Sequence, residues 1–330
     1  MLALVFDGQV SLREVPIPEP QVGEALIRVR LAGICGTDLH IVRGYADFHG
    51  VLGHEFVGQV VASPDPTWLH RRVVGEINLP CGQCAWCQIG LSRHCASRHV
   101  LGIRDKDGCL AEFITLPLAN LHAVPDTVPD AFAVFTEPLA AALEIVEQVH
   151  LTPSSRVLIV GDGRLGMLIG LVLRLSGCEL HVVGRHPQHL DYLGARGLIG
   201  HIAEGFAQDG FDVVIEATGN PAGWQTALAA VRPRGTIVLK STYSGQGREN
   251  PTAVVLPEVK VVGSRCGPFA PALRLLARRL VNPKKLIARI YPLAQAPEAL
   301  AFAAQRGVLK VLVEMPAYEP DVSVVSGAPH

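Results

Sequence analysis

Hydrophobic positions follow different patterns in different parts of this chain. In ALIRVRLAG, residues 25–33, apolar and polar side chains alternate, as in a strand with one face in water. At residues 157–160 the apolar run is continuous, as in a parallel strand covered on both faces, and an apolar helical stretch at 165–173 follows it. The pattern therefore predicts a β-rich segment over residues 1–138 and alternating strands and helices over 139–281.

Glycines separate the continuous run from the apolar stretch that follows it. Gly161, Gly163 and Gly166 form the pattern G-x-G-x-x-G at this point. Between a strand and a helix this is the dinucleotide-binding fingerprint: the glycines allow a tight turn, a close approach of the pyrophosphate, and close packing of helix on strand. The sequence thus predicts an α/β protein with a doubly wound parallel sheet of the Rossmann type.

Further strands are predicted at 179–185, 212–219 and 235–241. The carboxyl ends of such strands line the ligand crevice of a doubly wound sheet. The predicted cofactor-binding residues are those of the turn and of the strand ends: Gly161, Gly163, Arg164, Leu165, Gly166, Gly184, Arg185, His186, Thr218, Lys240 and Ser241.

The end of the second strand distinguishes NAD from NADP. An acidic residue there accepts hydrogen bonds from the ribose 2′-OH of NAD and repels a 2′-phosphate. This chain has Gly184 there, followed by Arg185 and His186, which favours NADP with the Arg185 guanidinium on the phosphate. The alternative is that Arg185 is a solvated loop cation and that NAD binds without a carboxylate.

Composition and charge narrow the choice of partners. The chain has 29 Lys and Arg against 30 Asp and Glu, a formal net charge of -1, so no overall field draws it to nucleic acid or to an anionic membrane. We expect a small-molecule ligand. The apolar run at 165–173 is too short to span a bilayer. The opening MLALVF reaches Asp7 without the basic segment or the length of a secretory signal, so the expected compartment is the cytoplasm.

Four cysteines are crowded into PCGQCAWCQIGLSRHC, residues 80–95: Cys81, Cys84, Cys87 and Cys95. Four thiolates at such spacings suit a tetrahedral, closed and therefore structural zinc site. Two disulfides or inert buried thiols are the alternative, which a reducing cytoplasm disfavours. The segment shows no helix or strand pattern, so we expect a loop organised around the metal.

A second group of metal-ligating residues lies nearer the N-terminus. LAGICGTDLH contains Cys35, and VLGHEFVG contains His54 and Glu55. A thiolate, an imidazole and a carboxylate suit zinc, and three protein ligands leave one position open for water or substrate, which is the profile of a catalytic metal. Taken singly, the three have plainer interpretations as a core cysteine, a buried histidine and a surface charge. The dinucleotide fingerprint favours the catalytic interpretation.

Together these motifs resemble the zinc-dependent medium-chain dehydrogenase/reductase family of alcohol, polyol and threonine dehydrogenases. The resemblance also covers VPIPEPQVGEALIRVRLAGICGTDLH, GHEFVG at 53–58, TEPLAAAL at 136–143 and EATG. It implies a GroES-like β-barrel catalytic domain over 1–138, interrupted by the Rossmann domain at 139–281 and completed by 282–330. It also implies a homodimer or homotetramer.

The resemblance implies roles for individual residues. Cys35, His54 and Glu55 resemble the catalytic zinc ligands, and Glu137 matches an acidic residue that polyol dehydrogenases place beside the metal. For Glu137 the alternative is a carboxylate stabilised by a helix N-terminus.

Three more residues resemble groups around the metal. Thr37 and His40 resemble a proton relay, and Asp38 resembles the carboxylate that orients a zinc-bound histidine. For His40 the alternative is an exposed loop histidine.

The implied reaction is zinc-dependent, NAD(P)-linked hydride transfer between an alcohol and its ketone or aldehyde, with about two zinc ions per chain. Glu137 favours a secondary alcohol or a polyol as substrate; a primary-alcohol or threonine-type dehydrogenase is the alternative. A zinc-free quinone or enoyl reductase has no reason to carry both sets of zinc ligands. A non-catalytic NADP- and zinc-binding protein is the less favoured interpretation, since fold alone does not imply chemistry.

Overall fold

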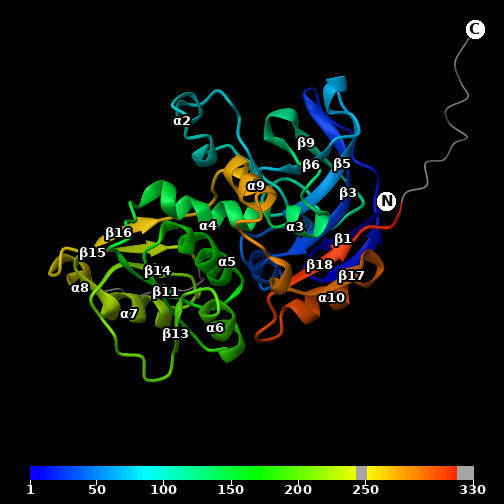
Figure 1. Ribbon diagram of the computed structural model, residues 1–330. Helices are drawn as coiled ribbons and strands as arrows, with labels where there is room; N and C mark the ends of the chain where they lie inside the picture. The colour runs from blue at the N-terminus through cyan, green and yellow to red at the C-terminus, as the bar shows by residue number, and fades with distance from the viewer. Residues whose placement is uncertain (243–250, 318–330) are drawn as a thin grey trace, which may run out of the picture.

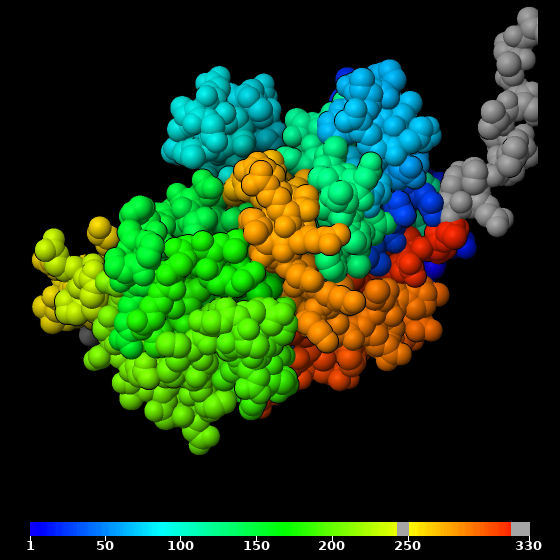
Figure 2. Space-filling view, viewed as in Figure 1, coloured from blue at the N-terminus to red at the C-terminus, as the bar shows by residue number. Residues whose placement is uncertain are grey.

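Two lobes make up the computed structural model, which describes residues 1–242 and 251–317 (Figure 1). One lobe contains the N-terminal strands together with the last two strands of the chain, and the other contains the middle of the chain. A short segment around α2 (Ala85–Gln88) projects from the first lobe over the second, as the cyan atoms of Figure 2 show.

The strands of the first lobe pair antiparallel, except that β17 and β18 are parallel. A seven-stranded sheet has the order β10-β6-β5-β3-β18-β17 with β9 paired to β3, a three-stranded sheet has the order β2-β1-β4, and β7 pairs with β8. The strands are β1 (Leu2–Phe6), β2 (Val10–Glu14), β3 (Glu24–Ile34), β4 (Gly50–Val51), β5 (Glu55–Ala62), β6 (Arg72–Gly75), β7 (Asn78–Leu79), β8 (His99–Val100), β9 (Phe113–Pro117), β10 (Leu121–Ala123), β17 (Ile287–Pro292) and β18 (Lys310–Glu314).

The second lobe contains a six-stranded parallel sheet in the order β13-β12-β11-β14-β15-β16. Its strands are β11 (Arg156–Val160), β12 (Glu179–Gly184), β13 (Ile199–Ile202), β14 (Phe211–Glu216), β15 (Val231–Leu239) and β16 (Lys260–Gly263). Numbered within the sheet this is 3-2-1-4-5-6, the order of a doubly wound dinucleotide-binding domain. The predicted Rossmann sheet is confirmed, and its ligand crevice falls at the carboxyl ends of β11 and β14, where the strand order reverses.

Helices cover the sheets and join the lobes. They are α1 (Gly36–Ile41), α2, α3 (Asp130–Ala133), α4 (Thr136–Gln148), α5 (Arg164–Leu173), α6 (Pro187–Gly194), α7 (Pro221–Ala230), α8 (Thr252–Val255), α9 (Phe269–Ala277) and α10 (Ala296–Ala303). No helix in the described part of the chain is long and apolar enough to cross a membrane.

Two details differ from the sequence patterns. The segment 80–95 was expected to be a loop, but it contains α2 and a 3₁₀ turn at Ser92–His94; helices this short are below the length at which apolar periodicity is visible. The domain boundary predicted at residue 138 falls inside α4. The end of the predicted segment 282–330 lies outside the described residues.

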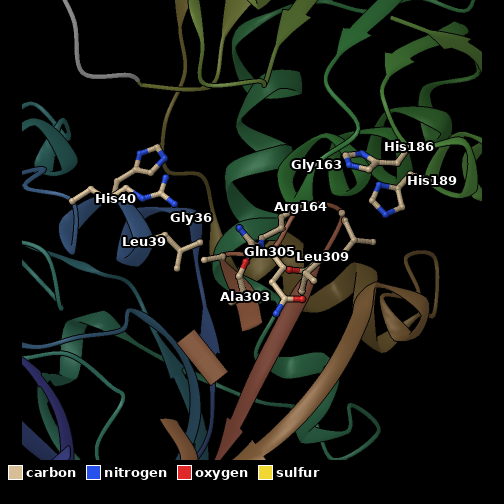
Figure 3. A pocket seen from close by; sticks show the side chains of 14 residues that line it. Gly36, Leu39, His40, Gly163, Arg164, His186, His189, Ala303, Gln305 and Leu309 are labelled. Atoms are coloured by element: carbon tan, nitrogen blue, oxygen red, sulfur yellow. Dashed lines mark hydrogen bonds between the residues drawn. The ribbon is translucent and has the colours of Figure 1, made fainter. Parts of the chain in front are cut away.

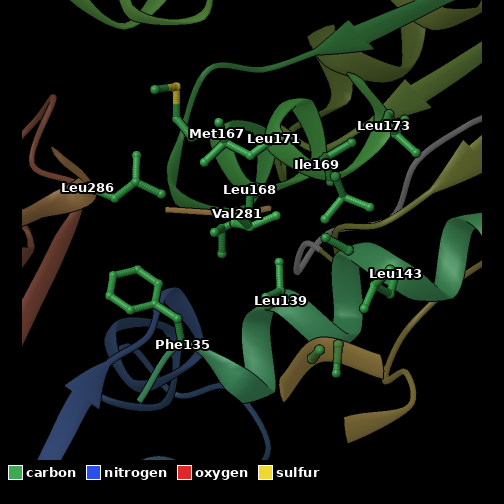
Figure 4. Packing of buried hydrophobic residues seen from close by; sticks show 14 of the residues in the cluster. Phe135, Leu139, Leu143, Met167, Leu168, Ile169, Leu171, Leu173, Val281 and Leu286 are labelled. Atoms are coloured by element: carbon green, nitrogen blue, oxygen red, sulfur yellow. The ribbon is translucent and has the colours of Figure 1, made fainter. Parts of the chain in front are cut away.

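A single hydrophobic cluster runs from one lobe into the other. It includes Leu31 and Val57 of the first lobe. Phe135, which is fully buried, Leu139 of α4 and Leu168 of α5 belong to the same cluster (Figure 4). Burial of apolar surface therefore holds the Rossmann sheet against the first lobe, and sets the width of the crevice between them.

We expect Leu168→Ala to lower the free energy of unfolding by about 2–5 kcal/mol, because it leaves a cavity where α5 meets this cluster. Leu168 is 1% exposed, whereas Leu175, just after α5, is 42% exposed. Leu175→Ala is therefore the matched control and should change stability little. Chemical denaturation followed by circular dichroism compares the two, and equal effects would contradict this account of the core.

Candidate active site and metal centres

The pairing of β3 with β5 brings the first predicted metal ligands together. Gly33 is the partner of Glu55 across the two strands, so Cys35, just past the end of β3, lies beside His54, just before β5. One ligand atom each of Cys35, His54 and Glu55 lies within 4.8 Å of the others. Gly33 is required here because any Cβ at that position would collide with the Glu55 carboxylate.

Asp38 lies against this cluster and is fully buried. Its Oδ2 accepts the backbone N–H of Cys35 at 2.7 Å, and its Oδ1 lies 3.3 Å from Nδ1 of His54. The second contact is close but poorly aligned, and neither of its atoms has a hydrogen bond within the residues that the structure describes. Burial lowers the pKa of His54, but the Asp38 carboxylate and the Cys35 sulfur outweigh it and raise that pKa well above its ordinary value. The cluster is thus arranged around a positive charge, which suits a cation between Cys35 and His54.

Lys310 is a site residue that the motifs did not reveal. It opens β18, which pairs with β3, and it is 2% exposed. Its ammonium group forms a buried ion pair with Oε2 of Glu55 and lies 3.4 Å from the carbonyl oxygen of Ile34. The one available signal was a lysine at the start of the apolar run KVLVE, and its partner is 255 residues away in sequence. Glu55 therefore has one oxygen paired, and its Oε1 has no hydrogen-bond partner among residues 1–242 and 251–317.

Glu137 faces the cluster without joining it. It stands in the first turn of α4 and is not among the residues whose ligand atoms lie within 4.8 Å of one another. Burial raises its pKa to about 7, opposed by the charge of His54 and reinforced by that of Glu55. The structure thus places an acidic side chain beside the predicted metal, and direct ligation by Glu137 stays a prediction.

Thr37 and His40, the predicted proton relay, lie on α1 next to Cys35. The Thr37 hydroxyl is 3.7 Å from the Cys35 sulfur. His40 is half-buried, and both burial and the positive charges of Arg43 and Arg164 lower its pKa. A histidine held neutral in this way is suited to accept a proton.

The four clustered cysteines converge as predicted. All four are free thiols, and their sulfur atoms all lie within 4.8 Å of one another. The sulfurs of Cys84 and Cys87 are 3.5 Å apart, as are those of Cys81 and Cys95. Tetrahedral zinc with Zn–S bonds of about 2.3 Å requires sulfurs about 3.8 Å apart, so the set fits zinc closely.

The backbone around these thiols also favours thiolate ligands. Backbone N–H groups of Gln83 and Cys84 lower the pKa of Cys81 to about 6, whereas burial and the neighbouring Cys84 raise that of Cys87 to about 12. The Cys81 thiol is thus readily ionised, whereas the Cys87 thiol stays protonated until a bound cation stabilises its thiolate.

The glycine-rich turn has the geometry of a phosphate cradle. Gly161 has φ +115°, which favours glycine, and any Cβ on Gly166 would collide with the carbonyl oxygen of Gly161. Gly163 precedes α5, and a Cβ there would meet nothing within 4 Å. Open backbone at a helix N-terminus is what a pyrophosphate requires, so these residues fit the dinucleotide.

A cavity of about 260 Å³ lies between this turn and the first lobe (Figure 3). Gly163 and Arg164 line it on one side, and Gly36 and His40 line it on the other. Arg164 crosses the gap, because its guanidinium donates to the carbonyl oxygens of Ala303 and Leu309. The predicted relay and the predicted dinucleotide turn therefore share one cavity.

Two of the predicted strand-end residues form hydrogen bonds to other groups of the protein. The hydroxyls of Thr218 and Ser241 both donate to the buried Glu216, and the backbone N–H of Gly219 donates to Ser241 Oγ at 2.9 Å. Lys240 donates to Ser264 Oγ at 3.1 Å, and burial lowers its pKa to about 8. These contacts brace the strand ends that border the crevice.

At the end of β12, the exposed side chain of Arg185 follows Gly184, as the sequence predicted. The backbone N–H groups of Arg185 and His186 both donate to the carboxylate of Asp162, at 3.1 and 2.7 Å. Asp162 is a second residue that the motif analysis missed, since it is a variable position of the fingerprint. Asp162, His186 and His189 form a third close group of ligand-type side chains.

Comparison with known proteins places the chain in a family. Residues 21–126 match the alcohol dehydrogenase GroES-like domain, and residues 165–278 match the zinc-binding dehydrogenase domain. The L-threonine 3-dehydrogenase of Chelativorans sp. is 32% identical over 69% of this chain and 72% of its own length. The sorbitol dehydrogenase of Halalkalibacterium halodurans is 26% identical over 93% of this chain and 96% of its own. The chain belongs to the zinc-dependent medium-chain dehydrogenase/reductase family.

Solved structures agree with this assignment. An alcohol dehydrogenase from Escherichia coli CFT073, complexed with NADH, is 27% identical, covers 95% of this chain and 99% of its own, and has a TM-score of 0.86. A zinc-binding dehydrogenase from Sinorhizobium meliloti 1021, bound to NADP, is 28% identical, covers 95% and 98%, and has a TM-score of 0.87. The predicted fold of GroES-like barrel and Rossmann domain is confirmed, and the activity is NAD(P)-linked oxidoreduction of alcohols.

We expect purified protein to contain about two zinc ions per chain, one for each set of ligands. Cys84→Ser should remove one and also lower the thermal stability, because the projecting segment has only the metal as its core. Cys35→Ser should remove the other with little loss of stability. Elemental analysis measures the zinc content of each variant, and thermal melts measure its stability. If wild-type protein contains one zinc ion per chain and Cys35→Ser contains the same amount, the zinc site at Cys35 is contradicted.

Proposed function

We propose that Cys35, His54 and Glu55 hold the catalytic zinc of a dehydrogenase that acts on a secondary alcohol or polyol, and that Cys81, Cys84, Cys87 and Cys95 hold a structural zinc. The observation that carries the proposal is the shared cavity: Gly36 and His40, next to the first cluster, face Gly163 and Arg164 of the dinucleotide turn. Hydride transfer needs the carbinol carbon of an alcohol, whose oxygen the metal would bind, next to the nicotinamide, and a cavity between the two groups of residues supports this arrangement.

A zinc ion held there would supply Lewis acidity to the substrate oxygen, and a bound nicotinamide would accept the hydride. The residues of the chain perform the remaining tasks. The Thr37 hydroxyl accepts the substrate proton as it passes its own proton on towards His40, whose lowered pKa lets the imidazole release that proton to solvent. Asp38 orients the His54 ring through Nδ1.

The substrate class rests on Glu137. An acidic side chain beside the metal is a feature that the resemblance associates with polyol dehydrogenases, and the similarity to sorbitol dehydrogenase supports it. A threonine-type or primary-alcohol dehydrogenase is the second candidate, supported by the similarity to L-threonine 3-dehydrogenase. A homodimer or homotetramer is proposed on the family resemblance, and a cytoplasmic location on the free thiols of all eight cysteines.

One similar structure holds NADH and another holds NADP. The preference for NADP that the sequence favours rests on Gly184 and on the exposed Arg185.

Cys35→Ser should abolish alcohol oxidation and leave dinucleotide binding almost unchanged, because it removes a metal ligand and leaves the Rossmann turn intact. The control is Cys178→Ser, the same substitution in the Rossmann domain outside both cysteine sites. Activity is measured on a panel of secondary alcohols, polyols, primary alcohols and hydroxy amino acids, with and without chelator. Activity retained by Cys35→Ser, or in fully demetallated protein, would contradict the metal mechanism.

Arg185→Ala should raise the apparent KM for NADP by about tenfold and that for NAD far less, because a guanidinium paired with a 2′-phosphate forms charge-assisted hydrogen bonds. Steady-state kinetics with both cofactors test this. Arg274→Ala, which removes an exposed arginine of α9, is the control for net charge. Equal changes for the two cofactors would remove any role of Arg185 at the phosphate.

A further inference from the structure

A carboxylate lies where the second Rossmann strand lacks one. Gly184 ends β12, the position at which the fingerprint places the acid that binds the adenosine ribose. A Cβ on Gly184 would lie 2.5 Å from Oδ2 of Asp162 and closer still to the Cβ and Cγ atoms of that residue. Asp162 lies between Gly161 and Gly163, so its side chain fills from the turn the space that an acid at position 184 would fill from the strand.

Hydrogen bonds hold the Asp162 carboxylate at the strand end. Oδ2 accepts the backbone N–H groups of Arg185 and His186, and Nδ1 of His186 lies 3.1 Å from both carboxylate oxygens. An ionised carboxylate can only accept, so this imidazole nitrogen carries the proton. Within residues 1–242 and 251–317, Oδ1 has no hydrogen-bond partner besides His186, and it retains the capacity to accept another hydrogen bond.

The same arrangement opposes a phosphate. The backbone N–H groups at 185 and 186 are donors that an anion at the end of β12 would use, and the carboxylate already occupies both. A 2′-phosphate would stand beside a negative charge that is only 5% exposed. The exposed Arg185 is the opposing cation, and a single ion pair in water does not offset both of these effects.

We propose that Asp162 selects the dinucleotide: it accepts a hydrogen bond from the 2′-OH of the adenosine ribose, and NAD is therefore preferred over NADP. The inference rests on the proposed function in needing a dinucleotide in the Rossmann crevice. It assigns the preference opposite to the one that Gly184 and Arg185 favour in the sequence. The reason is that the ribose meets the carboxylate in the space at the strand end, whichever residue supplies it.

The decisive variant is Asp162→Asn, which removes the charge and keeps the shape. NADH and NADPH are titrated separately against the holoenzyme, with nicotinamide fluorescence as the readout. Wild-type protein should bind NADH more tightly, and Asp162→Asn should reduce the ratio of the two affinities about tenfold, because it weakens the ribose contact and removes the repulsion of the phosphate. Asp191→Asn, at an exposed position on α6, removes the same charge and should leave the ratio unchanged.

A second set of variants moves the carboxylate back to the strand. Asp162→Ala should lose the preference for NADH, and Asp162→Ala combined with Gly184→Asp should regain it. Gly184→Asp alone forces two carboxylates into one space and should weaken the binding of both dinucleotides. If Asp162→Asn does not fold, as judged by circular dichroism, the double variant decides the question, since it keeps one carboxylate in this space and the net charge of the chain.

Two results would overturn the proposal: tighter binding of NADPH than of NADH by wild-type protein, or equal changes in the two affinities on Asp162→Asn. Equal changes would mean that Asp162 only anchors the turn. Because the readout is binding and not turnover, a failure to oxidise any alcohol would count against the proposed function alone and would leave the assignment of Asp162 intact.

Discussion

The register of β3 against β5 and β18 is the constraint on which the catalytic site depends. β5 pairs with one edge of β3 and places Glu55 opposite Gly33, and β18 pairs with the other edge and places Val311 opposite Ile34. Three segments that are far apart in the sequence thereby deliver a thiol, an imidazole, a carboxylate and an ammonium group to one end of one strand. A slip of β5 or β18 by one residue would turn Glu55 or Lys310 to the opposite face of the sheet.

The pairing of opposite charges explains how this cluster can be buried. Glu55 and Lys310 neutralise each other in a site with little access to water, where an unpaired charge would be very costly. The Asp38 carboxylate and the Cys35 sulfur raise the pKa of the buried His54, and a metal cation between Cys35 and His54 would take the place of the proton that they favour. Burial lowers the pKa of Arg164, on the far side of the crevice, and Cys35, Glu55 and Asp38 oppose that shift.

The two lobes are joined by apolar contact and also by this arginine. Phe135 and its neighbours form a continuous core across the boundary, whereas Arg164 spans the crevice itself and binds the carbonyl groups that precede β18. A cation at the first position of a helix is disfavoured by the helix dipole. Its presence at the dinucleotide turn is consistent with a site that receives pyrophosphate, which would compete with those carbonyl groups for the guanidinium.

The sequence by itself determined the local features: the cysteine quartet, the glycine-rich turn, and the strand and helix that flank it. Each of these depends on residues close together in the chain, where spacing directly limits geometry. Only the tertiary structure decided that Lys310 pairs with Glu55 and that Asp162 stands in the space beside Gly184, because strand pairing and turn packing bring these side chains together from distant or variable positions. For the same reason the sequence shows a missing carboxylate at the end of β12, while the folded chain supplies one from the neighbouring turn.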